Sequence, residues 1–147
     1  MKTTTLVLGI CLLFCISSCS QDFKKLNNSE VDKSKVKLAQ DFASDFFNKL
    51  KVGETYQFKN EATELIKNQF SEKVQRATYE QLKNGFGEFI SVEYTEAWIQ
   101  NSDKTNLIVR LKAKFEKSKK KLELRVVINK SNNVSGFWVK PWSDMLK

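Results

Sequence analysis

The chain of 147 residues contains no histidine. A Ser-His-Asp triad, a Cys-His dyad, a histidine zinc site and a histidine proton shuttle are therefore excluded within it. Its five glycines are scattered and form neither a Walker-type nor a dinucleotide-type phosphate loop. Any acid–base chemistry would have to use Asp, Glu, Lys or Tyr side chains.

The chain also lacks an apolar run long enough to span a bilayer. A transmembrane helix needs about 20 apolar residues, and the run from Leu6 to Ile16 has only eleven. Lys2 precedes this run, and Ile16-Ser17-Ser18-Cys19 closes it. A charged start, a short apolar segment and small residues before a cleavage site are typical of a secretory signal.

The closing tetrapeptide resembles a bacterial lipobox, in which small residues precede a cysteine that receives the lipid. The resemblance implies cleavage between Ser18 and Cys19, and acyl chains such as palmitate on Cys19. Two or more chains hold a protein stably on a membrane, whereas one holds it only marginally. Because Cys11 and Cys15 would leave with the signal, the mature domain keeps no thiol for a disulfide, a metal or catalysis. We expect no cofactor.

The chain has a formal net charge of +8. The simplest explanation of this charge is a solvated lysine-rich surface. Of the two possible partners, it favours an anionic membrane surface, because the lipid would place the domain beside headgroups, and we expect no nucleic-acid partner. We expect Lys117 to Lys121 to form a charged hairpin tip. The alternating Arg110, Lys112 and Lys114 predict a solvated sheet face with cross-strand pairs to Glu123 and Arg125, with a cationic binding face as the alternative.

Apolar residues with a period near 3.6 predict helices over residues 32–51 and 61–70. A third helix is expected from Thr78, because Thr78-Tyr79-Glu80-Gln81 fits a capping box. Gly85 and Gly87 would end it.

After Gly87 the apolar period changes to two. The pattern predicts strands over residues 90–100, 105–115, 121–129 and 134–139, joined by polar turns. The odd spacing of Glu93 and Glu96 predicts that they lie on opposite sheet faces and form no carboxylate pair. Of the tryptophans near the C-terminus, Trp138 and Trp142, one is expected to pack on the sheet and the other to be exposed. The result is an α+β fold, with N-terminal helices packed on a curved four-stranded antiparallel meander sheet.

The helix ending Phe46-Phe47-Asn48-Lys49-Leu50, the stretch Gly87-Glu88-Phe89 and the element Val134-Ser135-Gly136-Phe137 resemble a known pattern. They are similar to the cystatin-like cone fold of nuclear transport factor two, and within it to the bacterial family named domain of unknown function thirty-eight eighty-seven. The resemblance implies a space between the first helix and the bent sheet, which is either a pocket or a filled core. The candidate lining residues are Phe46, Leu107, Val109, Leu111, Leu124, Val126 and Ile128.

Together these patterns predict a signal peptide at residues 1–18, a lipidated tether at 19–30, a single domain at 31–142 and a tail at 143–147. We expect a lipid-anchored, non-enzymatic binding or interaction domain of the bacterial cell envelope, on the outer face of the cytoplasmic membrane or in the outer membrane. Its partners would be the membrane through Cys19, and an envelope protein or a small apolar ligand. The alternatives are a carrier of a small hydrophobic ligand in the cone pocket, and a carboxylate-dependent hydrolase or isomerase.

Overall fold

The computed structural model describes residues 22–117 and 122–146. Cys19, the expected cleavage site after Ser18, and residues 118–121 of the expected lysine hairpin lie outside the described residues. Every described helix and strand lies within residues 22–146. A chain that begins at Ser20 therefore retains all the contacts described below.

The sheet has five antiparallel strands in the order β1-β2-β3-β4-β5, which are Phe23–Lys25, Phe89–Gln100, Asp103–Phe115, Leu122–Ile128 and Val134–Pro141. The expected α+β class and the four-stranded meander are thus present, but the strand number was wrong. The additional strand, β1, pairs with the end of β2 and lies inside the range expected to be a tether. With only three residues in a polar segment, it carries no apolar period that would reveal a strand.

Between residue 22 and β2, three helices precede the long strands. Helix α1 spans Lys33–Lys51, and the carboxylate of Asp32 accepts hydrogen bonds from the backbone nitrogens of its first turn. Helix α2 covers only Glu64–Gln69, because Ala62 forms a parallel bridge to Val134 instead of a helical turn.

Helix α3 spans Glu72–Phe86, so it begins six residues before the expected start. Thr78 lies in its middle, and the predicted capping box was wrong. Gly85 lies within the helix, and Gly87 ends it with φ of 81°, a left-handed conformation that glycine adopts without strain.

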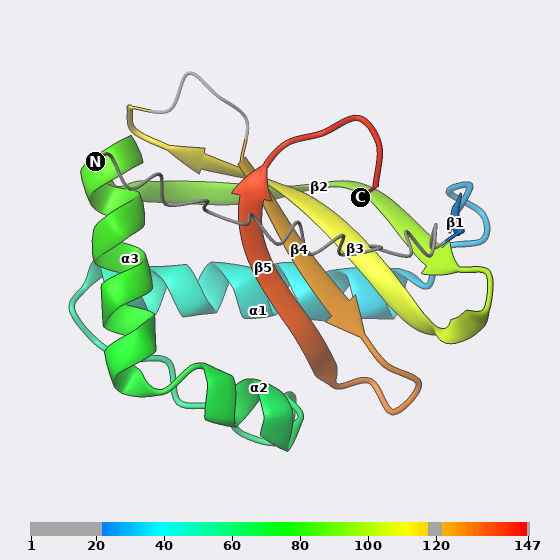
Figure 1. Cartoon of the computed structure of the whole chain (residues 1–147), viewed down its shortest axis with the longest axis horizontal. Coiled ribbons are helices and arrows are strands. Elements are labelled where there is room, and N and C mark those ends of the chain that lie inside the picture. Colours follow the sequence, from blue (N-terminus) through cyan, green and yellow to red (C-terminus); the bar gives the residue numbers. More distant parts are fainter. Residues whose placement is uncertain (1–21, 118–121, 147) are drawn as a thin grey trace, which may run out of the picture.

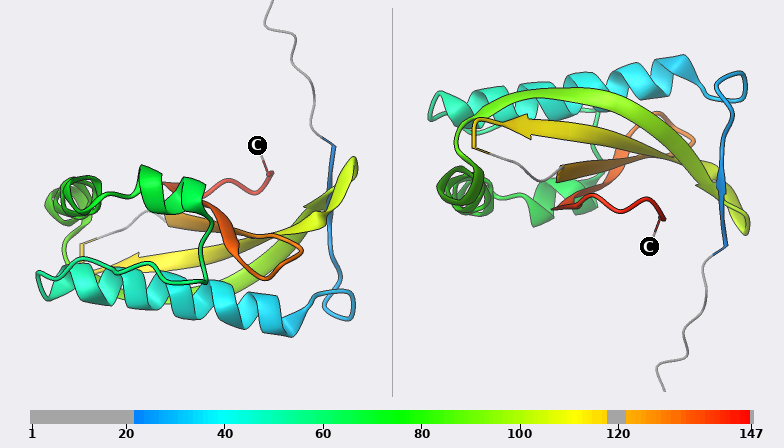
Figure 2. Two further views of the ribbon diagram at one scale, coloured as in Figure 1. Left: turned by 90° about the horizontal axis from the view of Figure 1, so that it is seen from below. Right: turned by 90° about the horizontal axis from the view of Figure 1, so that it is seen from above.

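The sheet has two differently covered faces. Helix α1 lies along one of them, and the C-terminal segment crosses the other (Figure 2). We call these the inner and the outer face. Helix α3 stands across one end of α1 and of the sheet (Figure 1). In the described part of the chain, no helix combines the length and the apolar character needed to cross a membrane.

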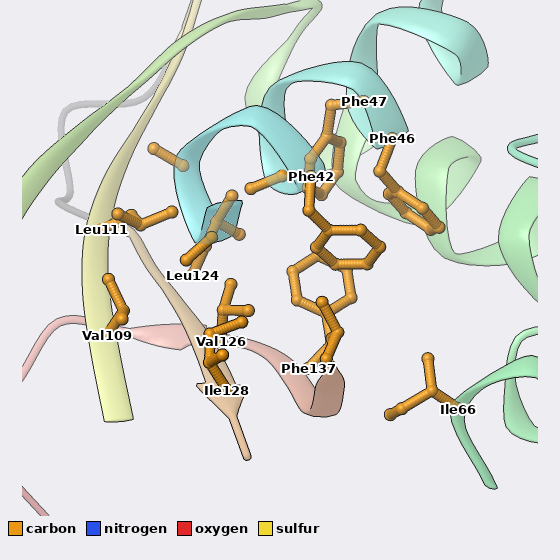
Figure 3. Packing of buried hydrophobic residues seen from close by; sticks show 14 of the residues in the cluster. Phe42, Phe46, Phe47, Ile66, Val109, Leu111, Leu124, Val126, Ile128 and Phe137 are labelled. Atoms are coloured by element: carbon orange, nitrogen blue, oxygen red, sulfur yellow. The ribbon is translucent and has the colours of Figure 1, made fainter. Parts of the chain in front are cut away.

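The core lies between α1 and the inner face, where phenylalanines of α1 point towards strand residues and Phe137 (Figure 3). The ring of Phe46 lies 5.2 Å from that of Phe137 and 5.4 Å from that of Phe47, measured between centroids. The seven residues considered as pocket lining are all buried in this core, and five of them are fully inaccessible strand residues: Val109, Leu111, Leu124, Val126 and Ile128.

Candidate binding site on the outer sheet face

A β-bulge determines which side chains β2 presents on the outer face. The pairing Tyr94 with Leu111 is followed directly by Glu96 with Arg110, so Thr95 is the extra residue. Since Glu93 pairs with Lys112 and Glu96 with Arg110, both glutamates lie on the outer face. The prediction that they lie on opposite faces was wrong, because it assumed a regular strand.

An ion-pair network is buried on this face. The guanidinium of Arg110, fully inaccessible to solvent, donates hydrogen bonds to Glu96 and, at 2.7 Å, to Glu123. Glu123 also accepts a bond of 2.7 Å from Arg125. The second oxygen of Glu96 pairs with Lys25 of β1. The network therefore ties four of the five strands together through side chains.

The network keeps both buried carboxylates ionised. Burial raises the pKa of Glu123, but hydrogen bonds from Arg110 and Arg125 and their charges outweigh it, so the pKa lies below its ordinary value. Burial likewise raises the pKa of Glu96. Hydrogen bonds from Lys25 and Trp98 and the charge of Arg110 outweigh this effect, so the pKa of Glu96 also lies below its ordinary value. Neither group is therefore poised to exchange protons near neutral pH.

The C-terminal segment covers the network. The Trp142 ring lies 4.2 Å from the guanidinium carbon of Arg110, a cation–π contact. The carbonyl of Ser143 accepts a hydrogen bond from Arg110, and Leu146 is buried. The expectation of a solvated face was wrong at Arg110 and Glu123, because this long-range cover could not be read from the strands. The only sequence signal was the presence of opposite charges at outer positions of adjacent strands.

A groove of about 440 Å³ lies beside the network on the same face. Ile108, Val127 and Gly136 pair with one another across β3, β4 and β5, so they form an apolar row. A Cβ at Gly136 would overlap the Trp138 ring, so this glycine allows the indole to lie flat over the strand. Trp138 is 52% exposed. The residues lining the groove are Phe23, Gln100, Asn106, Ile108, Arg125, Val127, Trp138, Val139 and Lys140.

A second cavity, of about 290 Å³, lies between the helices and the edge strand β5. It is bordered by aromatic and aliphatic side chains, with the Thr78 hydroxyl as a polar group: Phe46, Phe47, Phe70, Val74, Thr78, Phe137, Trp138 and Val139. Phe46 is the candidate lining residue that borders it. Another of the seven, Leu107, borders a separate polar depression near β1.

Two tyrosine hydroxyls are engaged in hydrogen bonds with carboxylates. The Tyr56 hydroxyl donates to Glu61 at 3.0 Å, and burial, with that carboxylate, raises the pKa of Tyr56. Burial and a hydrogen bond to Glu88 raise the pKa of Tyr79 to about 12. Both phenols therefore remain protonated donors. Within residues 22–117 and 122–146, no cluster of three Asp, Glu or Cys side chains could hold a metal ion.

No known protein family, curated protein or solved structure matches this chain.

Proposed function

We propose that this protein is a lipid-anchored, non-enzymatic binding domain of the bacterial cell envelope, and that its binding site is the groove on the outer sheet face. The family resemblance and the cystatin-like cone belong to the same proposal. The packing of α1 along the inner face of an antiparallel sheet supports the cone.

The groove itself carries the proposal. Its volume falls in the range of about 300–1,000 Å³ that is common for small-molecule sites, and it combines an apolar floor with a few polar groups at its ends. About half of the Trp138 surface is exposed there, although burial of an indole ring normally stabilises a protein or a complex. An exposed aromatic beside cations is a frequent feature of binding surfaces.

The catalytic alternative has less support. A hydrolase or isomerase using a carboxylate would need that group open to substrate and, where it acts as a general acid, a raised pKa. The two buried carboxylates, Glu96 and Glu123, have lowered pKa values and are ion-paired with the buried Arg110. Their role in this proposal is to hold the outer face rigid around the groove.

The position of β1 limits how far the groove could lie from a lipid on Cys19. Phe23, the first residue of β1, follows Cys19 by four residues, which span at most about 14 Å when extended. Since Phe23 also borders the groove, lipidation of Cys19 would hold the groove close to the membrane surface. The expected tether of twelve residues is thereby shortened at its C-terminal end.

A second candidate function, carriage of a small apolar ligand, is favoured by the cavity of about 290 Å³ behind β5. Its aromatic lining offers no charged group, so it would accept a neutral apolar molecule. The two candidates share Trp138 and Val139 but differ in their other lining residues.

Mass spectrometry of the protein purified from bacterial membranes under native conditions separates the two. We expect a bound small molecule that is retained by the control variant Lys73→Gln, on the exposed surface of α3, and lost on Lys140→Glu in the groove. Loss on Val74→Trp alone, which would fill the apolar cavity, would favour the carrier instead. A protein that carries no bound molecule in any form would contradict small-molecule binding.

A further inference from the structure

The two edge strands of the sheet differ in how they are protected against pairing with another chain. Strand β1 has three residues, of which two are lysines, and a short edge strand that carries lysine is a poor template for a further strand. Strand β5 has eight residues and is the last in the sheet order. We call the side of β5 that faces away from β4 its free edge.

The free edge forms main-chain hydrogen bonds at one residue. The backbone nitrogen of Val134 donates to the carbonyl of Glu61 at 2.7 Å, and its carbonyl accepts from the nitrogen of Thr63 at 2.9 Å. The chain then enters α2 and leaves the strand. Among the described residues, no backbone segment pairs with the free edge along residues 136–139. An edge of this length is a template for a further strand.

The cavity of about 290 Å³ lies along this part of the free edge. It is bordered by three consecutive residues of β5, Phe137, Trp138 and Val139. Consecutive side chains of a strand point to opposite faces, so a cavity that contacts all three reaches the edge of the strand itself. Helix α3 runs beside β5 (Figure 1) and borders the cavity with Val74 and Thr78. We call this space between β5 and α3 the edge slot.

The edge slot has an uncharged lining and an exposed apolar rim. Val74 and Trp138 border it from opposite sides, and both are large hydrophobic residues that remain exposed. The lining residues are all uncharged, so a charged side chain placed there would lose its water without gaining a partner. The volume lies just below the range of about 300–1,000 Å³ that is common for small-molecule sites. These properties suit an apolar side chain of a larger ligand.

We propose that the edge slot binds an extended, uncharged segment of another protein, which pairs with β5 as a sixth strand and places an apolar side chain in the cavity. In strand addition, main-chain hydrogen bonds give affinity and side-chain pockets give specificity. A second copy of this chain fits less well, because its own α3 stands beside its β5 and would meet the α3 of the first copy. The inference goes beyond the groove on the outer face and does not depend on it.

Fluorescence anisotropy with the chain from Ser20 onward tests the proposal with labelled, uncharged heptapeptides that are blocked at both ends. In the first probe, threonines alternate with valine, phenylalanine and valine, so the three apolar side chains share one face of an extended strand. We expect it to bind with a one-to-one ratio. A second probe has the same composition but three adjacent apolar residues, and it should bind at least about tenfold more weakly, because those side chains point to both faces.

N-methylation of the alternating probe distinguishes strand pairing from apolar contact alone. The N–H groups of alternate residues point to opposite edges of an extended strand, so only one set can bond to β5. One peptide carries N-methyl groups on two apolar residues, and the other carries them on two threonines. One of them should bind at least about tenfold more weakly than the parent probe, and the other should bind within about threefold of it. Binding should also slow amide hydrogen exchange in β5 and leave that of β1 unchanged.

Variants locate the site. Val74→Trp and Thr78→Trp would each fill the edge slot from α3, and each should weaken binding of the alternating probe by about tenfold or more. Ile90→Trp is the matched control, because it places the same ring at an exposed apolar position of β2. It should leave binding unchanged. The two slot variants change different residues, so misfolding of one leaves the other as a test.

Four results would overturn the inference. They are absence of binding of the alternating probe, equal effects of the two N-methylated peptides, binding that both slot variants retain, and a dimer of the chain that is lost on Val74→Trp, which would assign the slot to a second copy. A small molecule that co-purifies and is lost only on Val74→Trp would likewise assign the cavity to the carrier function. None of these experiments alters Lys140, so the groove on the outer face is decided separately by its own variant.

Discussion

Replacement of Phe46 by alanine is expected to lower the free energy of unfolding by about 3–5 kcal/mol. The Phe46 ring is fully buried and contacts several aromatic rings, including those of Phe42 and Phe70 at centroid distances of 6.0 and 5.9 Å. Phe42 is on α1, Phe70 follows α2, and Phe137 on β5 also contacts Phe46, so the space left by Phe46 cannot close without moving several parts of the core. Urea unfolding of the chain from Ser20 onward measures the loss.

Leu65→Ala serves as the matched control for this measurement. Leu65 is also an apolar helical residue, but it is 60% exposed, so its loss should change stability by less than about 0.5 kcal/mol. A similarly small loss for Phe46→Ala would show that the face of α1 assigned to the core is wrong.

Arg110→Leu is expected to be comparably destabilising, with a loss of about 3 kcal/mol or more near neutral pH. Removal of one partner from a buried ion pair leaves the other charge uncompensated, which typically costs about 3–5 kcal/mol. Glu123 retains Arg125, and Glu96 retains Lys25, so we expect the lower part of that range. Lys37→Leu, which breaks the exposed pair with Asp41, should cost no more than about 1 kcal/mol.

The pH dependence distinguishes lost charge from lost packing in this variant. Because the folded-state pKa values of Glu96 and Glu123 are lowered, their stabilisation is present above the ordinary carboxylate pKa of about 4.3 and is lost as the pH falls below it. The difference in unfolding free energy between wild type and Arg110→Leu should therefore shrink as the pH falls towards about 3. A difference that does not change with pH would contradict the ionic account.

The regular elements could be predicted because their periodicity is local. The α1 pattern, the shift to a period of two after Gly87 and the polar turns gave β2 to β5 with errors of a few residues. The start of α3 was missed because residues 72–77 are largely polar, and Thr78 with Gln81 matched a cap motif that the helix does not use. A local motif cannot predict the first residue of a helix where tertiary packing determines it.

The candidate site was less accessible from sequence, for two physical reasons. The bulge at Thr95 moves Glu96 to the outer face, and the residues around it contain no pattern that predicts an extra residue in the strand. The burial of Arg110 depends on Trp142 and Ser143, which lie more than thirty residues away in the chain. Periodicity reports which residues share a face, but it cannot report what covers that face.

Metabolic labelling with a clickable palmitate analogue in a bacterial host tests most directly whether the domain is lipid-anchored. The full-length chain should incorporate the label, and Cys19→Ser should abolish it. Cys11→Ser and Cys15→Ser are matched controls that should retain the label, because both residues lie in the segment expected to be removed. Labelling that persists in Cys19→Ser, or that never occurs in the unaltered chain, would contradict the lipid anchor and with it the membrane-held groove.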